Sequence, residues 1–212
     1  TIGAMILMHS DNKGLVIPPR VAPTKAVIVP ILFDQSKEKV LDRAQQLSSE
    51  LEEQGIYSFV DTREEYSPGW KYNEWEMKGI PIRIEFGPKD LEKGTAVLVR
   101  RDTAEKKTVN LDNISEEIHD LSEKMHYDMF EKARENFNNN MQEVSNWEDF
   151  KKAIDNRQFV SSWHCSEEEC EDQIKAETQG ATTRAIITKE TSGKCVKCGK
   201  DAAYKVYFSK NY

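Results

Sequence analysis

Four cysteines constrain the C-terminal part of this chain more than any other feature. They follow the pattern C-x4-C, then 24 residues, then C-x2-C: Cys165, Cys170, Cys195 and Cys198. Each pair can present two sulfurs on a tight turn, and two such turns make a tetrahedral four-sulfur cage that suits Zn at about 2.3 Å per bond. Because the protein would supply all four ligands, the metal would be structural. The spacing therefore predicts a small zinc-binding domain.

The residues around the second cysteine pair suit such a site. A glycine after Cys-x-x-Cys, here Gly199, frees the backbone to turn, so that amides can point at the sulfurs. Three lysines would soften the negative charge of four thiolates: Lys194, Lys197 and Lys200. Two alternatives stay open, a redox or disulfide pair and ordinary buried thiols. His164 could be a ligand in principle, but four thiolates already saturate the metal, so we treat it as a neighbour.

Upstream, residues 23–110 alternate between apolar strands and helical patterns. We expect strands at 26–29, 56–60, 81–86 and 96–99, with Pro30 at a strand end or edge. A helix capped by Ser36 carries apolar residues at helical spacing and stops at Gly55: Val40, Ala44, Leu47 and Leu51. A shorter helix opens at Pro68 and closes at Gly79. This order predicts an α/β layered domain with a partly parallel, mixed sheet flanked by helices.

A long stretch from Ser115 to about Val144 contains neither proline nor glycine. Its apolar residues recur every three or four positions: Ile118, Leu121, Met125, Met129, Ala133, Phe137, Met141 and Val144. The pattern predicts one long amphipathic helix that links two domains. Asn146 and Asp149 then resemble a capping box for a short helix, and 203–208 reads as a strand. The C-terminal domain is therefore expected to be small and α+β.

The charge of the chain is concentrated in this helical region. The formal net charge is -7, and residues 111–150 carry 3 basic against 11 acidic side chains. Overall acidity argues against a nonspecific nucleic-acid binder that works through bulk positive charge. It does not exclude a local RNA-facing surface in the flanking, near-neutral regions. No stretch approaches the length of a membrane span, and the common phosphate-loop, nucleophile-elbow and zinc-protease motifs are absent from the sequence.

The N-terminal residues 2–8 form a short apolar run after Thr1. The run lacks a basic region before it, so it does not resemble a signal peptide. We expect a buried strand here. Such a strand has no obvious pairing partner at the start of the chain, which suggests that the chain is part of a longer protein.

Residues 61–92 hold the densest mixture of aromatic, basic and acidic side chains. RNA loops are read by stacking bases on aromatic rings and by hydrogen bonds to base edges. A carboxylate can accept from the N1–H and N2–H2 groups of guanine, and Arg or Lys suits its O6 and N7. A guanine reader is one interpretation. The other is a short amphipathic helix with surface ion pairs and Trp70 and Trp75 in the core.

Three blocks together resemble the C-terminal portion of prolyl-tRNA synthetases of the archaeal/eukaryotic type, a class II family. The blocks are residues 2–5 (IGAM) with 13–23 (KGLVIPPRVAP), residues 68–92, and the four-cysteine module that ends in 207–212 (YFSKNY). The resemblance covers essentially the whole chain. It implies three parts: a remnant of the catalytic domain and linker at 1–22, an anticodon-binding domain at 23–125, and a zinc-binding domain at 126–212.

The resemblance also implies roles for single residues. By motif position, Glu76, Arg83, Lys89 and Asp90 would contact the edges of two anticodon guanines, and Tyr72 would stack. Lys106 or Lys107 could touch the same loop, although that stretch matches the family poorly. The four cysteines match the family's zinc ligands. The C-terminal carboxylate of Tyr212 would reach back towards the active site, as in the family.

As a function, the resemblance implies recognition of the tRNA(Pro) anticodon loop within a cytoplasmic proline–tRNA ligase. The complete enzyme would use ATP and Mg to attach proline, would contain the catalytic domain in the same chain, and would be a homodimer without a membrane association. This chain lacks the ATP and proline sites and is expected to be inactive alone. The alternatives are a stand-alone, non-catalytic RNA-binding or protein-interaction module with a structural zinc, and a purely structural zinc domain.

Overall fold

The computed structural model describes residues 1–189 and 192–210. Its contacts divide the chain into two compact units, with the boundary between Ala133 and Arg134. Each unit contains its own sheet and its own core, and each is described here by itself. The expectation for Tyr212 lies outside the described residues.

The first unit contains a five-stranded mixed sheet. Its strands are β1 (Ala26–Pro30), β2 (Ser58–Val60), β3 (Ile82–Phe86), β4 (Thr95–Arg100) and β5 (Lys106–Asn110), in the spatial order β2-β1-β3-β4-β5. The strands β2, β1 and β3 are parallel, and β4 and β5 are antiparallel to their neighbours. The partly parallel sheet predicted from the sequence is therefore confirmed.

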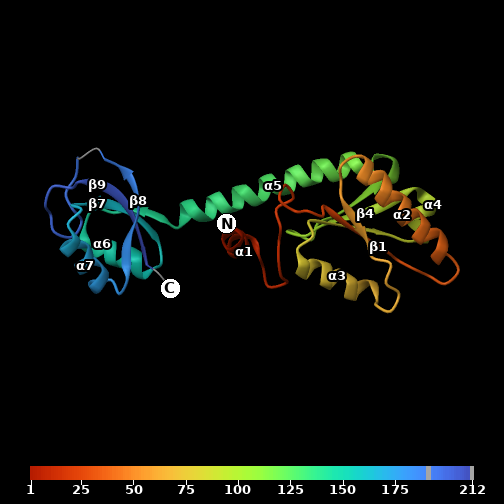
Figure 1. Ribbon diagram of the computed structural model, residues 1–212, viewed down its shortest axis with the longest axis horizontal. Coiled ribbons are helices and arrows are strands. Elements are labelled where there is room, and N and C mark those ends of the chain that lie inside the picture. The colour runs from red at the N-terminus through yellow and green to blue at the C-terminus, as the bar shows by residue number, and fades with distance from the viewer. Residues whose placement is uncertain (190–191, 211–212) are drawn as a thin grey trace. The chain divides into compact units, whose positions relative to one another are not determined.

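Helices cover both faces of this sheet. The unit contains α1 (Ile2–His9), α2 (Lys37–Glu53), α3 (Pro68–Lys78), α4 (Pro88–Lys93), the short 3-10 helix η1 (Leu111–Asn113) and the start of α5 (Ile114–Asn139). Figure 1 shows α2 and α3 on opposite sides of the strands, as expected for right-handed β-α-β connections on either side of β1. Pro30 lies at the end of a central strand, where its missing N–H costs no ladder bond.

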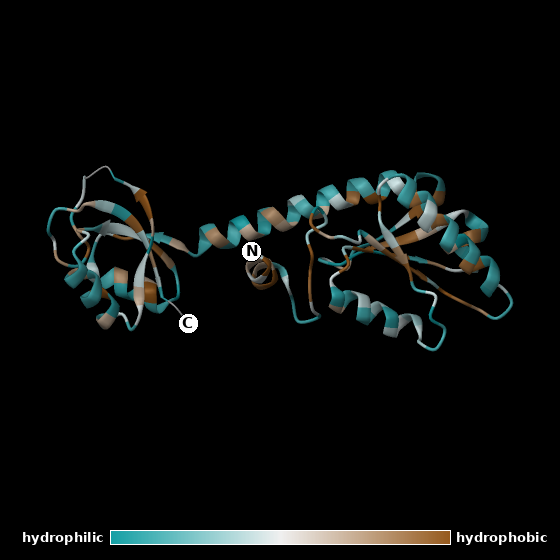
Figure 2. Ribbon diagram, in the orientation of Figure 1, coloured by the Kyte–Doolittle hydropathy of each residue, from teal (hydrophilic) through white to brown (hydrophobic). Residues whose placement is uncertain are grey.

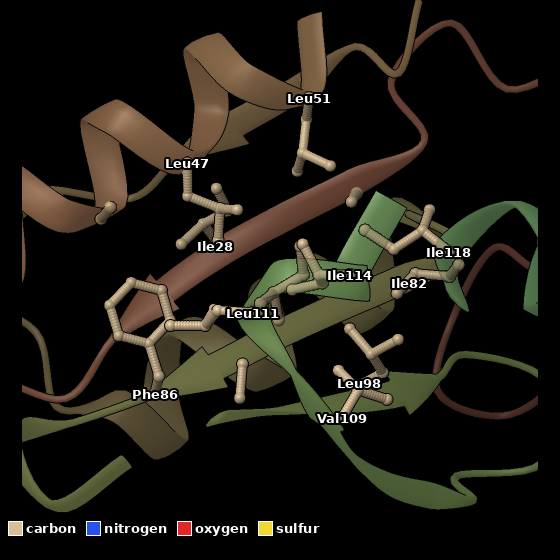
Figure 3. Packing of buried hydrophobic residues seen from close by; sticks show 14 of the residues in the cluster. Ile28, Leu47, Leu51, Ile82, Phe86, Leu98, Val109, Leu111, Ile114 and Ile118 are labelled. Carbon is tan, nitrogen blue, oxygen red and sulfur yellow. The ribbon is translucent and has the colours of Figure 1, made fainter. Parts of the chain in front are cut away.

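The core lies between the sheet and the helices α2 and α5. All four predicted apolar residues of α2 are buried, and Leu47 and Leu51 pack above Ile28 of β1 (Figure 3). On β3, the side chains of Ile82 and Ile84 point into the same cluster. Because successive residues of a strand face opposite sides, Arg83 and Glu85 must face the other side, which α3 partly covers. Because Ile82 and Ile84 face the core, the polar residues between and after them on β3 lie on the face of the sheet that α3 partly covers.

The N-terminal residues are helical, so the predicted buried strand is wrong. The helix α1 buries none of its side chains, and Ile2 and Leu7 are 73% and 77% exposed. Figure 2 shows the hydrophobic colouring of this exposed helix. A strand must bond to a neighbouring strand, and no described strand pairs with residues 2–9. A helix instead satisfies its backbone groups within the segment.

The long helix is confirmed, but it is shorter than predicted. It ends at Asn139, so Met141 lies in β6 (Met141–Glu143) and Val144 follows that strand. Four of the five residues 136–140 are asparagine, which has a low helix propensity. The strand β5 was not predicted from the sequence, because most of it is exposed and shows no apolar alternation.

The second unit contains a four-stranded sheet made of β6, β7 (Phe159–His164), β8 (Ala181–Thr188) and β9 (Tyr204–Lys210), in the spatial order β6-β7-β9-β8. Its helices include α6 (Trp147–Asp155) and α7 (Glu168–Glu177). The expected cap of α6 is present, since the Asn146 side chain accepts a hydrogen bond from the Asp149 N–H at 2.9 Å. Phe150, Ile154 and Phe208 are fully buried in its core. The predicted small α+β domain is thus confirmed.

Among the described residues, the structure contains no helix with the length and apolar character that crossing a membrane requires.

Candidate nucleic-acid interface and metal centre

The helix α3 carries two of the five side chains predicted to contact the anticodon, Tyr72 and Glu76. Ser67 caps its start by accepting from the Trp70 N–H at 3.3 Å, and Pro68 occupies the first turn, where a missing N–H costs nothing. Gly79 ends the helix in the left-handed conformation, with φ at 76°. Local sequence therefore sets both ends of α3.

One side of α3 is fixed by a buried carboxylate. Asp61, which is fully buried, accepts from the Trp75 indole N–H at 2.8 Å and from the Arg63 guanidinium at 2.7 and 2.9 Å. The ammonium group of buried Lys71 lies 3.7 Å from the carboxylate and donates to the Asp61 carbonyl. Burial would raise the pKa of Asp61, but the hydrogen bonds from Arg63 and Trp75 outweigh it and bring the pKa to about 2. This cluster holds α3 against the sheet.

The other side of α3 contributes to a charged cluster with Arg83 at its centre. The Arg83 guanidinium donates to Glu76 Oε1 at 3.0 Å and to Glu85 Oε1 at 2.8 Å, and it lies 4.1 Å from the centre of the Tyr72 ring. Burial and the neighbouring Glu85 raise the pKa of Tyr72 to about 12. Burial alone would raise the pKa of Glu76, but the hydrogen bond from Arg83 and the charge of Lys13 lower it.

The second oxygen of each carboxylate points towards a more exposed lysine. Glu76 Oε2 lies 3.5 Å from Lys13 Nζ, and Glu85 Oε2 lies 3.5 Å from Lys106 Nζ. Both lysines are more than half exposed, so water or a ligand can replace these long contacts. The result is two oriented carboxylate acceptors, a half-buried aromatic ring and two exposed cations. This set can accept N–H groups from the edge of a guanine base.

The structure brings together only part of the predicted base-reading set. Tyr72, Glu76 and Arg83 are in one cluster, whereas Lys89 and Asp90 lie on α4, beyond the end of β3. Asp90 Oδ2 accepts from the Gly87 N–H at 2.9 Å and so caps α4, and Lys89 is exposed. Within the described part of the chain, neither residue makes a hydrogen bond or ion pair with the Arg83 cluster.

Two members of the Arg83 cluster, Glu85 and Lys13, were not predicted from the sequence as site residues. Glu85 could have been found, because it follows Arg83 by two positions on a strand and must share its face. Lys13 could not, since it is distant in sequence and reaches Glu76 only through tertiary structure. Lys106 and Lys107 were the two lysines that could touch the same loop. Lys106 contacts the cluster, whereas Lys107 pairs with Glu117 of α5.

The alternative interpretation placed Trp70 and Trp75 in the core. It describes Trp75, which is half-buried, better than Trp70, which is 44% exposed.

The four cysteines gather at one end of the second unit. Cys165 directly follows β7, Cys170 lies in α7, and Cys195 and Cys198 lie in one turn. Two pairs of sulfurs lie close, Cys170 with Cys195 at 3.7 Å and Cys165 with Cys198 at 3.6 Å. A tetrahedral site with Zn–S bonds of about 2.3 Å separates its sulfurs by about 3.8 Å, so the spacing fits such a metal.

The backbone around the second cysteine pair prepares the sulfurs for a metal. Burial would raise the pKa of Cys195, but the amides of Cys198 and Lys197 point at its sulfur and bring the pKa to about 7. Burial raises the pKa of Cys170 above its ordinary value. Deprotonation of Cys170 would therefore need the positive charge of a bound metal. All four cysteines are free thiols, without a disulfide.

His164 also belongs to this cluster. One of its ring nitrogens lies within 4.8 Å of the sulfurs of Cys165, Cys170 and Cys195, and His164 is buried. Its Nδ1 accepts from the Ser166 N–H at 3.2 Å, while its buried Nε2 has no hydrogen-bond partner among the described residues. The geometry thus offers five donors for four positions, and Cys198 is the most exposed of the cysteines.

Known proteins resemble this chain along its whole length. Residues 25–121 match a family described as "Anticodon binding domain", and residues 147–212 match one described as "Prolyl-tRNA synthetase, C-terminal". Over the full chain, the sequence is 45% identical to "Proline–tRNA ligase 2" of Clostridioides difficile and 46% identical to "Proline–tRNA ligase" of Acetoanaerobium sticklandii. The chain spans 44% of the length of each of these relatives. Both are bacterial proteins, and the archaeal/eukaryotic subtype stays a prediction.

Proposed function

Because the chain belongs to the prolyl-tRNA synthetase family, we propose that it recognises the anticodon of tRNA(Pro) as the C-terminal region of a proline–tRNA ligase. The observation that supports this most is the Arg83 cluster on the α3 side of the sheet. It combines an aromatic ring with fixed carboxylate acceptors, which is the chemistry that reads an unpaired guanine.

In this cluster, we assign different tasks to the charged groups. Arg83 is 9% exposed and shared between two carboxylates, so it orients Glu76 and Glu85 and contributes a base contact only at its free edge. The second oxygens of the carboxylates then accept N1–H and N2–H2 of guanine, and Tyr72 supports the stacked base. Lys89 and Asp90, on α4, would serve a second guanine.

The whole enzyme would attach proline to tRNA(Pro) with ATP and Mg. We place the ATP and proline sites in a catalytic part of the same protein outside this chain, with residues 1–22 as its remnant. The domain limits 23–125 and 126–212, the homodimer and the cytoplasmic location belong to the same proposal. The chain alone would bind RNA without catalysing the reaction.

We further propose that the metal is a structural zinc held by Cys165, Cys170, Cys195 and Cys198. The sulfur spacing and the amides directed at Cys195 support this. Bound zinc would stabilise negative charge on the thiolates and tie β7, α7 and the cysteine turn together. It would leave no open position for chemistry.

The decisive test of the anticodon proposal is binding to tRNA(Pro), measured with Arg83→Ala and Glu76→Ala in the chain. Each substitution should weaken binding by about 1–3 kcal/mol, because each removes a base-edge contact or the group that orients it. Replacement of either anticodon guanine should weaken wild-type binding and have less effect on the variants.

Arg43→Ala is the matched control, since Arg43 also pairs with a glutamate, Glu50, but lies on α2 across the sheet. It should bind normally. Thermal unfolding of every variant separates loss of binding from loss of fold. Wild-type affinity for both Arg83→Ala and Glu76→Ala would refute the anticodon assignment.

A further inference from the structure

A cavity lies in the first unit, at the carboxyl ends of β1 and β2. The loop that follows β1 (31–36) and the loop that leads into α3 (61–67) form its walls, and its volume is about 310 Å³. Ligand sites of α/β sheets occur outside the carboxyl ends of the parallel strands. Known ligand pockets cover about 300–1,000 Å³, so this one suits a single small ring system.

Aromatic side chains enter this cavity from both loops. Phe33 lies in the first loop and is 62% exposed, although it has no visible task in the core. Tyr66 lies in the second loop, and Trp70 stacks on it with the ring centres 3.9 Å apart and the planes inclined by 12°. The Arg63 guanidinium lies 5.2 Å from the centre of the Tyr66 ring and 5.4 Å from that of the Trp70 ring. The stack of Tyr66 on Trp70 therefore also has a cation–π partner.

The charges around the cavity cancel. Its lining contains three acidic and three basic side chains: Asp34, Glu64, Glu65, Lys37, Arg63 and Lys71. The basic groups are already paired, Lys37 with Glu64 and Arg63 with Asp61 and Glu74. A phosphate would therefore find no unpaired cation among the described lining residues. A flat, neutral, aromatic ligand fits better, because stacking needs no net charge.

The cavity and the Arg83 cluster use the same helix. Tyr66 lies in the loop just before α3 and Trp70 in its first turn, and Tyr72 and Glu76 follow on the same helix. We propose that Phe33 and Tyr66 receive a third unpaired base of the anticodon loop, a base outside the two guanines, by stacking. This inference rests on the proposed function. Stacking in the cavity adds affinity for the RNA and fixes the path of the RNA strand. It discriminates only weakly between different bases at this position, since every base has a stacking face.

The test places the fluorescent base 2-aminopurine at one unpaired position at a time in a tRNA(Pro) anticodon stem-loop. With the wild-type chain, one position other than the two guanines should be quenched on binding. Phe33→Ala should abolish that quenching and weaken binding about 5- to 100-fold. Tyr66→Leu, which keeps an apolar contact for Trp70, should act in the same direction. Tyr127→Ala is the control, because Tyr127 is also 62% exposed but lies on α5 outside the cavity.

The outcomes separate the two proposals. If Arg83→Ala weakens binding and Phe33→Ala does not, the cavity proposal is wrong and anticodon recognition stands. If neither variant weakens binding, both proposals are wrong. Loss of affinity in Phe33→Ala without a quenched position would also overturn base stacking in the cavity.

Discussion

At the scale of single residues, buried charges shape the first unit. Asp61 has no exposed surface, yet it is ionised, because Arg63, Lys71 and Trp75 supply donors and positive charge. A buried charge without such partners would be strongly destabilising. The same carboxylate connects the loop after β2 to the middle of α3. Its ionisation therefore contributes to the position of the helix that carries Tyr72 and Glu76.

This contribution predicts a pH-dependent stability. The pKa of Asp61 falls from 3.8 to about 2 on folding, so the carboxylate stabilises the fold by about 2 kcal/mol above pH 4. This stability is lost as the pH falls through about 2. Asp61→Asn should therefore lower the free energy of unfolding by at least about 2 kcal/mol at pH 7, and the difference from wild type should shrink as the solution is acidified below pH 4. Urea unfolding at a series of pH values measures it.

Asp112→Asn is the control for this series, because Asp112 is exposed in η1, just before α5. It should change the free energy of unfolding by no more than about 0.5 kcal/mol. A constant difference between wild type and Asp61→Asn at all pH values would contradict the role of the ionised carboxylate.

At the scale of elements, two segments hold the C-terminal end of α3: the chain before β1 and the residue that follows β4. The Leu15 N–H donates to the Met77 carbonyl at 3.0 Å, and the Arg101 guanidinium donates to the Glu76 carbonyl at 2.7 Å. The close approach needs glycine, since a Cβ on Gly79 would lie 2.6 Å from the Leu15 Cβ. These contacts hold the C-terminal end of α3, next to Glu76, in place.

Gly79→Ala should lower the free energy of unfolding by about 1–3 kcal/mol, because alanine is strained at a φ of 76° and also meets Leu15. Gly69→Ala, in the first turn of the same helix, is the matched control. Its added Cβ meets no atom within 4 Å, so this change should be neutral or stabilise by up to about 1 kcal/mol. Chemical denaturation compares the two variants, and equal effects would show that the close approach to Leu15 does not matter.

At the scale of the whole molecule, the negative net charge is distributed unevenly along the chain, and most of it lies between the two cores in sequence. The acidic excess of residues 111–150 lies mainly on α5 and just after it, while each flanking region is close to neutral. The total net charge therefore says little about the surface of either unit. The second unit has a small core, and small domains often need a metal for stability.

We expect about one zinc per chain by elemental analysis, and chelation should unfold the second unit while the first unit stays folded. Hydrogen exchange would then show loss of amide protection in β7 and β9 but not in β1 and β3. The metal content of variants also shows which four of the five donors bind the metal. Cys198→Ser should lower the metal content, and His164→Asn should not. A metal-free chain with full protection in both units would contradict a structural zinc.

Elements with a local pattern could be predicted from the sequence alone. The apolar spacing of Val40 to Leu51, the helix stop at Gly79 and the paired cysteines are each visible within a few residues. Features that need a partner distant in sequence became visible only in the folded chain. The segment 2–8 is apolar enough for a buried strand, but a strand forms only where a neighbouring strand offers hydrogen bonds, and this segment is helical. In contrast, the polar segment of β5 is a strand because it pairs with β4. Likewise, Lys13, Glu76, Arg83 and Glu85 become one cluster because packing of α3 on the sheet brings together residues from three separate segments.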